Sequence, residues 1–262
     1  MKIGIIGYGH VGKAMHKLFS NALIHDKYQK ITNSVTIAEI NHHCDTVFIC
    51  VPTDANPDGS CDVTIVEEVI KQLDVSLIII RSTVYIGFTD EMIAKYAKEI
   101  VFQPEYYGET VDHPFTNLAH RKWLSFGGRP TGIDLAIQTY QQVINSNVQI
   151  FQSDAKTAEL AKYMENAFLA TKVTFCNEMY DIAKKMGANY NLAREMWAID
   201  YRIGPSHSFV YENNRGFGGK CLPKDLSSLI YQAQEHKVDA TLISAVAQKN
   251  RLYQKAKQSS KK

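Results

Sequence analysis

Residues 2–12, KIGIIGYGHVG, combine a short apolar run with three closely spaced glycines. The apolar run ends at Ile6, and a helical pattern extends from Val11 to Phe19. Glycines in such a turn permit a sharp reversal, close approach of a pyrophosphate and tight packing of the helix on the strand. The N-terminus of the helix attracts phosphate groups. The stretch therefore predicts a dinucleotide site formed by Gly7, Gly9, His10, Val11 and Gly12.

An acid follows the second apolar run at the distance expected for a dinucleotide fold. The run from Ala22 to His25 ends at Asp26, about 20 residues after the glycines. An acid at this place bonds the ribose hydroxyls and disfavours a 2′-phosphate. We therefore predict NAD as the cofactor, in preference to NADP. The adjacent cation Lys27 weakens that preference.

Short apolar runs alternate with helical patterns as far as residue 151. Several runs are apolar on both faces, as in a parallel sheet covered by helices. This βαβ alternation predicts an α/β fold, a Rossmann-type doubly wound parallel sheet over residues 1–152. The predicted strands are residues 2–6, 22–25, 46–51, 76–80, 100–102, 123–126 and 148–151, and the predicted helices are residues 11–19, 62–73 and 89–98.

The pattern changes at Ser153, where a helical stretch without glycine or proline begins and runs to Met186. Gly187 ends it. Shorter helical patterns follow at residues 191–197, 225–235 and 239–253, and a loop rich in glycine and proline spans residues 204–223. We predict a second, smaller helical domain over residues 153–262, joined to the first through the long helix.

Composition excludes several classes of protein. The 262 residues carry a formal net charge of +2, which gives no electrostatic reason to expect nucleic-acid binding. No apolar run approaches the roughly 18 residues that a membrane helix needs, and the N-terminus lacks a signal-peptide pattern. Five cysteines without a regular framework fit a reducing cytoplasm. His42, His43 and Cys44 lack a second ligand set with zinc spacing, so we expect no metal.

The stretch GGKCLPKD, residues 218–225, has the most reactive composition in the chain. Its glycines let the backbone approach a ligand closely. A neighbouring cation favours the thiolate of Cys221, the nucleophilic form of the side chain. Asp225 follows one helical turn later and is placed to position or deprotonate water. A buried structural cysteine is the plainer alternative, and the surrounding residues argue against it.

Further polar candidates lie in otherwise apolar surroundings. Lys162 and Asn166 stand four residues apart on the long helix and so share one face. If that face meets the other domain, the ammonium and the amide stabilise an alkoxide during hydride loss; a solvated face is the plainer reading. Glu105 and Glu109 follow a strand, and a carboxylate in a cleft serves as a general base. Thr83 follows the strand at residues 76–80, beyond the carboxyl end where open sheets bind ligands.

Taken together, these motifs resemble the UDP-glucose/GDP-mannose 6-dehydrogenases, which oxidise a sugar CH2OH to a carboxylate with NAD in two steps. The resemblance covers nearly the whole chain. It rests on residues 7–12, 51–53, 58–59, 62, 82–84, 104–105, 159–170, 200, 202–204 and 218–225.

The resemblance implies two successive hydride transfers at one site. Lys162 and Asn166 would surround the developing oxyanion, and Cys221 would capture the aldehyde and pass through a thioester. Water, oriented by Thr83 and activated by Glu105 or Asp225, would release the acid. NAD would be held by the glycine motif, Asp26, Lys27, Val51, Pro52, Thr53, Thr83 and Glu109. A UDP-hexose, most simply UDP-glucose, would meet Glu105, Tyr106, Tyr107, Lys162, Asn166, Arg202, Tyr211, Gly218 and Cys221.

The chain also departs from the family pattern. Members usually have an arginine before the second acid of the Pro-Glu loop and a glycine after it, where this chain has Gly108 and Thr110. Members continue with a third domain that helps to hold the uridine diphosphate, so we expect a short form with normal NAD binding and poor oxidation of UDP-glucose. Family dimers join through the long helix, and the same is expected here, with Arg202 reaching toward the partner.

Two other functions remain open at this point. A one-step hydroxyacid dehydrogenase of the 3-hydroxyisobutyrate or 6-phosphogluconate type also pairs a dinucleotide domain with a Lys-x-x-x-Asn helix. Such an enzyme needs no thiol, so Cys221 discriminates against it. A non-catalytic NAD-binding partner protein is the remaining possibility. Against it, the chain has a reactive residue type at every position where the family's chemistry needs one.

Overall fold

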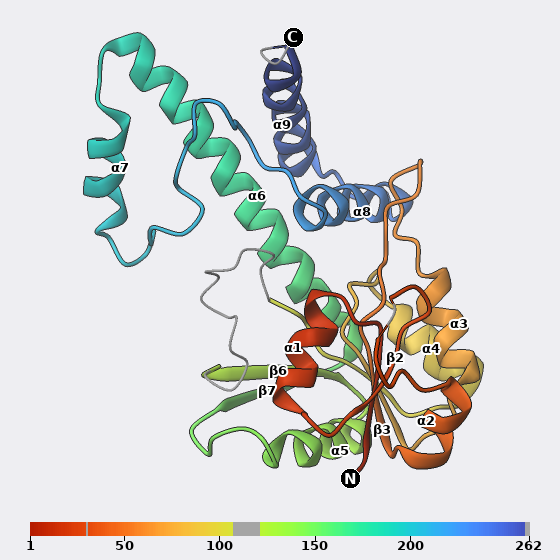
Figure 1. Cartoon of the computed structure of the whole chain (residues 1–262). Coiled ribbons are helices and arrows are strands. Elements are labelled where there is room, and N and C mark those ends of the chain that lie inside the picture. The colour runs from red at the N-terminus through yellow and green to blue at the C-terminus, as the bar shows by residue number, and fades with distance from the viewer. Residues whose placement is uncertain (30, 107–120, 260–262) are drawn as a thin grey trace. The chain divides into compact units, whose positions relative to one another are not determined.

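A computed structural model of the chain describes residues 1–29, 31–106 and 121–259 (Figure 1). Its seven-stranded sheet has the order β2-β1-β3-β4-β5-β6-β7. All neighbouring strands are parallel except β5 and β6, which run antiparallel. The strands are β1 (Ile3–Ile6), β2 (Leu23–His25), β3 (Thr46–Ile49), β4 (Leu77–Ile80), β5 (Ile100–Phe102), β6 (Trp123–Gly128) and β7 (Gln149–Ser153). The predicted doubly wound parallel sheet is confirmed, except that β5 and β6 run antiparallel.

Helices cover both faces of this sheet (Figure 1). On one face, α2 (Ile37–His43), α3 (Thr64–Gln72) and α4 (Phe88–Tyr96) bury Ile40, Ile70 and Phe88 against the strands. On the other face, α1 (His10–Leu18) and α5 (Pro130–Gln141) contribute Met15 and Tyr140 to a second core. Burial on both faces explains why β1, β3 and β4 are apolar at nearly every position.

Helices α2 and α5 have no counterpart among the predicted elements. Helix α2 is short and buries only Ile40, so its apolar periodicity is weak. Its start carries a capping box, in which Thr36 and Glu39 exchange hydrogen bonds. Helix α5 contains Gly132, where an added Cβ would lie 2.9 Å from Cγ2 of Val101 on β5. Close packing therefore requires a residue that sequence patterns associate with turns.

The chain divides into two compact units, one made of Met1–Asp54 and Cys61–Lys162, the other of Ala55–Ser60 and Tyr163–Lys262. The long helix α6 (Ala155–Met186) contributes to both units. The second unit also contains α7 (Tyr190–Ala198), α8 (Cys221–Glu235) and α9 (Thr241–Ser259). Its core includes Phe217, Leu226 and Val246. The predicted domain division after residue 152 stays a prediction.

The start of α8 corrects one expectation. The loop at residues 204–223 was expected to include Cys221, yet Cys221 is the first residue of α8. Pro223 does not end the loop, because proline fits the first turn of a helix, where its missing N–H has no helical partner to lose. Among the described residues, no helix has the length and apolar character needed to cross a membrane.

Candidate functional site

The glycine turn joins the end of β1 to the start of α1. Gly7 has a φ of +91°, and an added Cβ would lie 2.6 Å from the carbonyl oxygen of Cys50. A Cβ at Gly12 would overlap the carbonyl of Gly7. At Gly9, in contrast, an added Cβ would meet nothing within 4 Å. Gly7 and Gly12 thus serve the turn and its packing, and Gly9 leaves open space before His10, where α1 begins.

Asp26 is held beside this turn by three backbone N–H groups. Its Oδ2 accepts the N–H of Tyr8 at 2.7 Å, and its Oδ1 accepts those of Tyr28 and Gln29, both at 2.8 Å. Burial raises the pKa of Asp26, but the three hydrogen bonds outweigh it and leave the pKa below its usual value. An ionised acid next to an open glycine turn fits the ribose end of NAD. Lys27 lies close by, with its Nζ 5.6 Å from the centre of the Tyr28 ring.

Asp26→Ala should reduce the preference for NAD over NADP by at least about tenfold, because hydrogen bonds to a charged group contribute about 1.5–3 kcal/mol. Asp45→Ala is the matched control, since Asp45 instead accepts the N–H of Lys2 next to the amino end of β3. Dissociation constants for NADH and NADPH, measured by fluorescence titration, check this prediction. Equal binding of both cofactors by the unmodified chain would contradict the role of Asp26.

Two hydrogen bonds connect the segments that follow β3 and β4, beside the glycine turn. The hydroxyl of Ser82 donates to the carbonyl of Val51 at 2.6 Å, and that of Thr53 donates to the carbonyl of Thr83 at 2.7 Å. An added Cβ at Gly7 would also lie 2.9 Å from the backbone nitrogen of Val51. The predicted contacts Val51, Pro52, Thr53 and Thr83 therefore gather at the carboxyl edge of the sheet, where open α/β sheets bind ligands.

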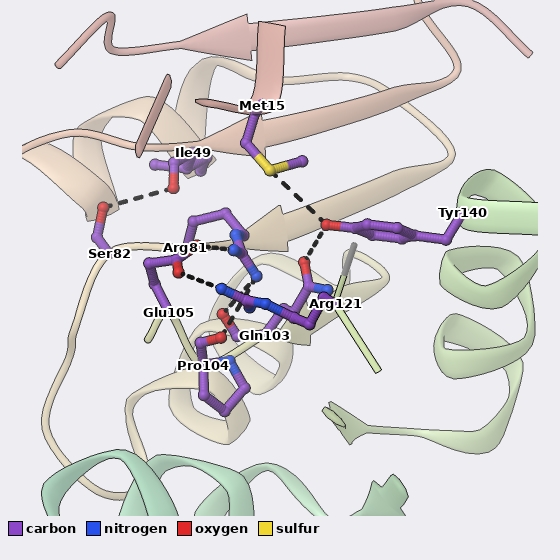
Figure 2. A network of polar contacts seen from close by, with 9 residues as sticks. All are labelled: Met15, Ile49, Arg81, Ser82, Gln103, Pro104, Glu105, Arg121 and Tyr140. Atoms are coloured by element: carbon purple, nitrogen blue, oxygen red, sulfur yellow. Dashed lines mark hydrogen bonds and ion pairs between the residues drawn. The ribbon is translucent and has the colours of Figure 1, made fainter. Parts of the chain in front are cut away.

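A buried ion-pair network lies next to this edge (Figure 2). Arg81, directly after β4, donates to the carbonyls of Gln103 and Pro104 at 3.2 and 3.4 Å and forms an ion pair with Glu105. Arg121 bonds the second carboxylate oxygen at 3.1 Å. Burial raises the pKa of Glu105, but the two guanidinium groups outweigh it and hold the pKa below its usual value. Glu105 is therefore a well-stabilised anion and a weak base. No local sequence pattern marks either arginine, because their partner Glu105 lies 24 and 16 residues away.

Lys162 approaches the same network from α6. Its side chain is buried, and its Nζ lies 5.3 Å from the centre of the Tyr106 ring. Tyr106 in turn contacts Trp123, with ring centres 4.9 Å apart. The positive charge of Lys162 also contributes to the lowered pKa of Glu105. These residues all belong to the first unit. Tyr107 and Glu109, two further predicted contacts, lie outside the described residues.

The second unit brings together the predicted Asn166, Cys221 and Asp225. The amide of Asn166 donates to Oδ2 of Asp225 at 2.5 Å, and Lys224 Nζ lies 2.6 Å from Oδ1. Asn166 and Asp225 are buried, whereas Cys221 is exposed. Cys221 and Asp225 are four residues apart on α8 and so share one face. The helix N-terminus also favours a negative charge on the sulfur.

The glycine loop before Cys221 is anchored to α9. The N–H of Phe217 donates to Oδ1 of Asn250 at 2.8 Å, and the amide of Asn250 donates back to the carbonyl of Phe217 at 2.9 Å. An added Cβ at Gly218 would meet nothing within 4 Å, which leaves the loop open to a ligand. Asn250 was not among the predicted site residues, because no local pattern marks a partner 33 residues away.

Two predicted substrate contacts lie on exposed loops of the second unit. Tyr211 is 64% exposed and pairs with Asn214 across an isolated β-bridge. Arg202 bonds the carboxylate of Asp200, with Nε 3.0 Å from both oxygens. His42 and His43 contact each other edge to face. Within the described ranges, no group of three potential ligands is placed to hold a metal ion.

Two matches to one protein family together cover most of the chain. Residues 21–111 match the NAD binding domain of the UDP-glucose/GDP-mannose dehydrogenase family, and residues 156–252 match its central domain. The UDP-glucose 6-dehydrogenase of Rickettsia typhi is 30% identical over 219 residues, which are 79% of this chain and 49% of that protein. That of Pseudomonas aeruginosa is 29% identical over 237 residues, 84% of this chain and 51% of that protein. The chain thus spans about half the length of these relatives.

Solved structures share the fold. A UDP-glucose dehydrogenase from Pyrobaculum islandicum aligns with a TM-score of 0.80 at 22% identity and covers 96% of this chain and 68% of its own. A UDP-D-ManNAc dehydrogenase from Pyrococcus horikoshii gives 0.81 at 23% identity with the same coverage. A 3-hydroxyisobutyrate dehydrogenase from Mycobacterium tuberculosis gives 0.70 at 18% identity and covers 94% of this chain and 91% of its own.

Proposed function

Because the chain belongs to the UDP-glucose/GDP-mannose dehydrogenase family, whose NAD binding and central domains it matches, we propose that it is a nucleotide-sugar 6-dehydrogenase. The proposed reaction oxidises a sugar CH2OH to a carboxylate in two steps, with UDP-glucose as the substrate. The observation that carries the proposal is the thiol of Cys221 on the same helical face as Asp225, which is bonded to Asn166. A one-step alcohol oxidation needs no such thiol.

The cofactor of this family's first domain is NAD, and the open turn at Gly9 with the ionised Asp26 fits it. When bound, NAD accepts one hydride in each of the two oxidations. The chain supplies the charges around the substrate. Lys162 and Asn166, four residues apart on α6, stabilise the oxygen of C6 as its proton and hydride leave.

Cys221 then adds to the resulting aldehyde. Its sulfur forms a bond to C6, and the carbonyl oxygen gains a proton to give a thiohemiacetal. Loss of that proton and a second hydride gives a thioester. Water attacks the thioester carbon, the thiolate of Cys221 leaves, and the acid is released. In the overall reaction, one alcohol, one water and two oxidised NAD are converted to one carboxylic acid, two NADH and two protons.

We assign activation of the water to Asp225 in preference to Glu105. Asp225 lies one turn from Cys221 on α8, so both act on the same carbon. Glu105 is held as an anion by two guanidinium groups, and Asp225 is likewise paired with the ammonium of Lys224, so the assignment rests on the position of Asp225 beside Cys221. In this proposal Glu105 holds the carboxyl edge of the sheet, and Thr83 orients the water. Arg202 and Tyr211 contact the nucleotide-sugar.

A panel of UDP-glucose, UDP-galactose and GDP-mannose, each with NAD, tests the proposed reaction. We expect two NADH per acid formed and no accumulation of aldehyde, because Cys221 retains the intermediate. The test measures NADH by absorbance and the acid by mass spectrometry. A 3-hydroxyacid oxidised with one NADH per product would favour the alternative, which the fold of the M. tuberculosis 3-hydroxyisobutyrate dehydrogenase supports. NADH binding without turnover on any of these compounds would favour a non-catalytic role.

We further propose that the protein acts as a homodimer in the cytoplasm. Helix α6 exposes a stripe of large apolar side chains within the second unit, formed by Met164, Phe168, Phe175, Ile182 and Met186. Their spacing of four and seven residues keeps them near one face, and a second copy would remove that face from water. Five free cysteines fit a reducing compartment. Sedimentation as a monomer at micromolar concentration would contradict the dimer.

A further inference from the structure

Glu159, on the second turn of α6, carries a carboxylate that no step of the proposed reaction uses. The residue is fully buried. Its Oε2 accepts the N–H of Gly87 at 2.5 Å, and its Oε1 accepts the N–H of Thr89 at 3.0 Å. These two amides lie at the start of α4, where Gly87 occupies the N-cap position and has no side chain to offer. Glu159 therefore caps α4 from another helix.

The first turns of α6 are held at other points as well. The carboxylate of Asp154 accepts the N–H and the hydroxyl of Thr157 at 2.9 and 2.7 Å, which caps the start of α6 itself. Helix α6 also lies directly against β6, because an added Cβ at Gly127 would fall 3.0 Å from the Cα of Ala155. Glu159 provides the polar link from this anchored start to α4.

The two segments joined by Glu159 carry residues with proposed roles. Lys162 lies three residues after Glu159 on α6 and is buried over the Tyr106 ring. Thr83 lies four residues before Gly87, in the loop between β4 and α4. All of these residues belong to the first unit.

We propose that Glu159 is a positioning residue, which fastens α6 to the start of α4 and so sets the place of Lys162 relative to the loop that carries Thr83. The inference rests on the proposed function, because the positioning matters through the roles of Lys162 and Thr83. Glu159 itself touches neither the sugar nor the cofactor in this account.

The link depends on the charge of Glu159. An ionised carboxylate accepts both N–H groups, whereas a protonated one carries a hydrogen on one oxygen and loses one of the two bonds. Burial raises the pKa of Glu159 to about 7, although the bonds from Gly87 and Thr89 oppose the shift. Asp90 on α4 also raises it, and Lys156 on α6 lies 4.0 Å from Asp90. In the connecting loop, the neutral hydroxyl of Tyr85 donates to Glu91 at 2.5 Å.

Because the pKa of Glu159 is raised, its contribution to folding stability and its two hydrogen bonds to α4 depend on pH in opposite directions. A folded-state pKa above the ordinary value means that protonation favours the folded state. The contribution of Glu159 to stability is therefore largest at low pH and declines as the pH rises through about 7. The two bonds to α4, in contrast, are complete only above that pH.

The variant Glu159→Gln, which mimics the protonated side chain, should separate the two effects. At pH 8 we expect kcat for UDP-glucose oxidation to fall by about tenfold, as small displacements of a catalytic group do. The melting temperature should be unchanged or higher. Wild-type kcat should decline below about pH 7, and this component should be absent from the variant. Asp154→Ala is the control: it removes the cap of the same helix, so it should lower the melting temperature and leave kcat within about twofold.

Two NMR readouts need no substrate. The amide signals of Gly87 and Thr89 should titrate near pH 7 in the wild type and not in Glu159→Gln. The ε-methylene protons of Lys162, over the Tyr106 ring, should shift in Glu159→Gln and stay in place in Asp154→Ala. Absence of nucleotide-sugar oxidation in the wild type would contradict the proposed function. The NMR signals would still show whether Glu159 fastens α6 to the start of α4. Static amides, an unmoved Lys162 or an unchanged kcat in Glu159→Gln would each overturn the inference.

Discussion

Cys221→Ala should abolish formation of the sugar acid while leaving NAD binding unchanged. The thiol forms the proposed covalent bond to C6, and loss of an essential nucleophile costs at least about 10³-fold in kcat. The binding of NAD should persist, because the glycine turn and Asp26 belong to the first unit and Cys221 to the second. The measurement is acid production under saturating NAD, together with NADH titration of the variant. Mass spectrometry of acid-quenched wild type should find the sugar on the peptide that contains Cys221.

Cys44→Ala provides the matched control for the loss of a thiol. Cys44 is buried, and burial raises its pKa to about 11, so its thiol is protonated at neutral pH and unreactive. Its replacement should change acid formation by less than about twofold, as expected for a cysteine that acts only as a small apolar side chain. Normal acid production by Cys221→Ala would rule out the covalent mechanism and leave the one-step dehydrogenase as the better account.

Glu105→Gln should lower the free energy of unfolding by about 3–5 kcal/mol, the cost of removing one partner from a buried ion pair. The substitution leaves the guanidinium groups of Arg81 and Arg121 buried with a neutral amide between them (Figure 2). Glu99→Gln is the control, because the ion pair of Glu99 with Arg129 is partly exposed and its loss should cost much less. Urea denaturation at pH 7 measures both variants. A loss no larger than that of Glu99→Gln would contradict the structural role of the network.

The same network predicts a pH dependence of stability in the wild type. The pKa of Glu105 lies below its usual value in the folded chain, so its contribution is fully present above the ordinary pKa of a glutamate. That contribution is lost as the pH falls through the lowered value. Glu105→Gln removes it, and the difference in unfolding free energy between the wild type and this variant should shrink as the solution is acidified.

Elements with a strong local pattern were predicted closely. The predicted strand ends lie within two residues of β1 to β7. For β1, β3, β4 and β5 the reason is that strands buried on both faces are continuous apolar runs. Helix α6 was predicted to within two residues at its start for a similar reason, since neither glycine nor proline interrupts it. Helices α2 and α5 were missed where the local signal is weak or carries a glycine. The start of α8 was placed too late because Pro223 was read as loop, although it fits the first turn of a helix.

The sequence alone determined the glycine turn, the acid at Asp26, the shared face of Lys162 and Asn166, and the four-residue spacing of Cys221 and Asp225. Each of these depends on spacing along a few residues, which the periods of helix and strand convert directly into geometry. Tertiary structure alone decided which distant groups meet. Glu105 lies 24 residues from Arg81 and 16 from Arg121, Asn166 lies 59 residues from Asp225, and Glu159 lies 72 residues from Gly87. Such pairs form through the order of the strands and the packing of helices, and buried charges require partners that no local pattern specifies.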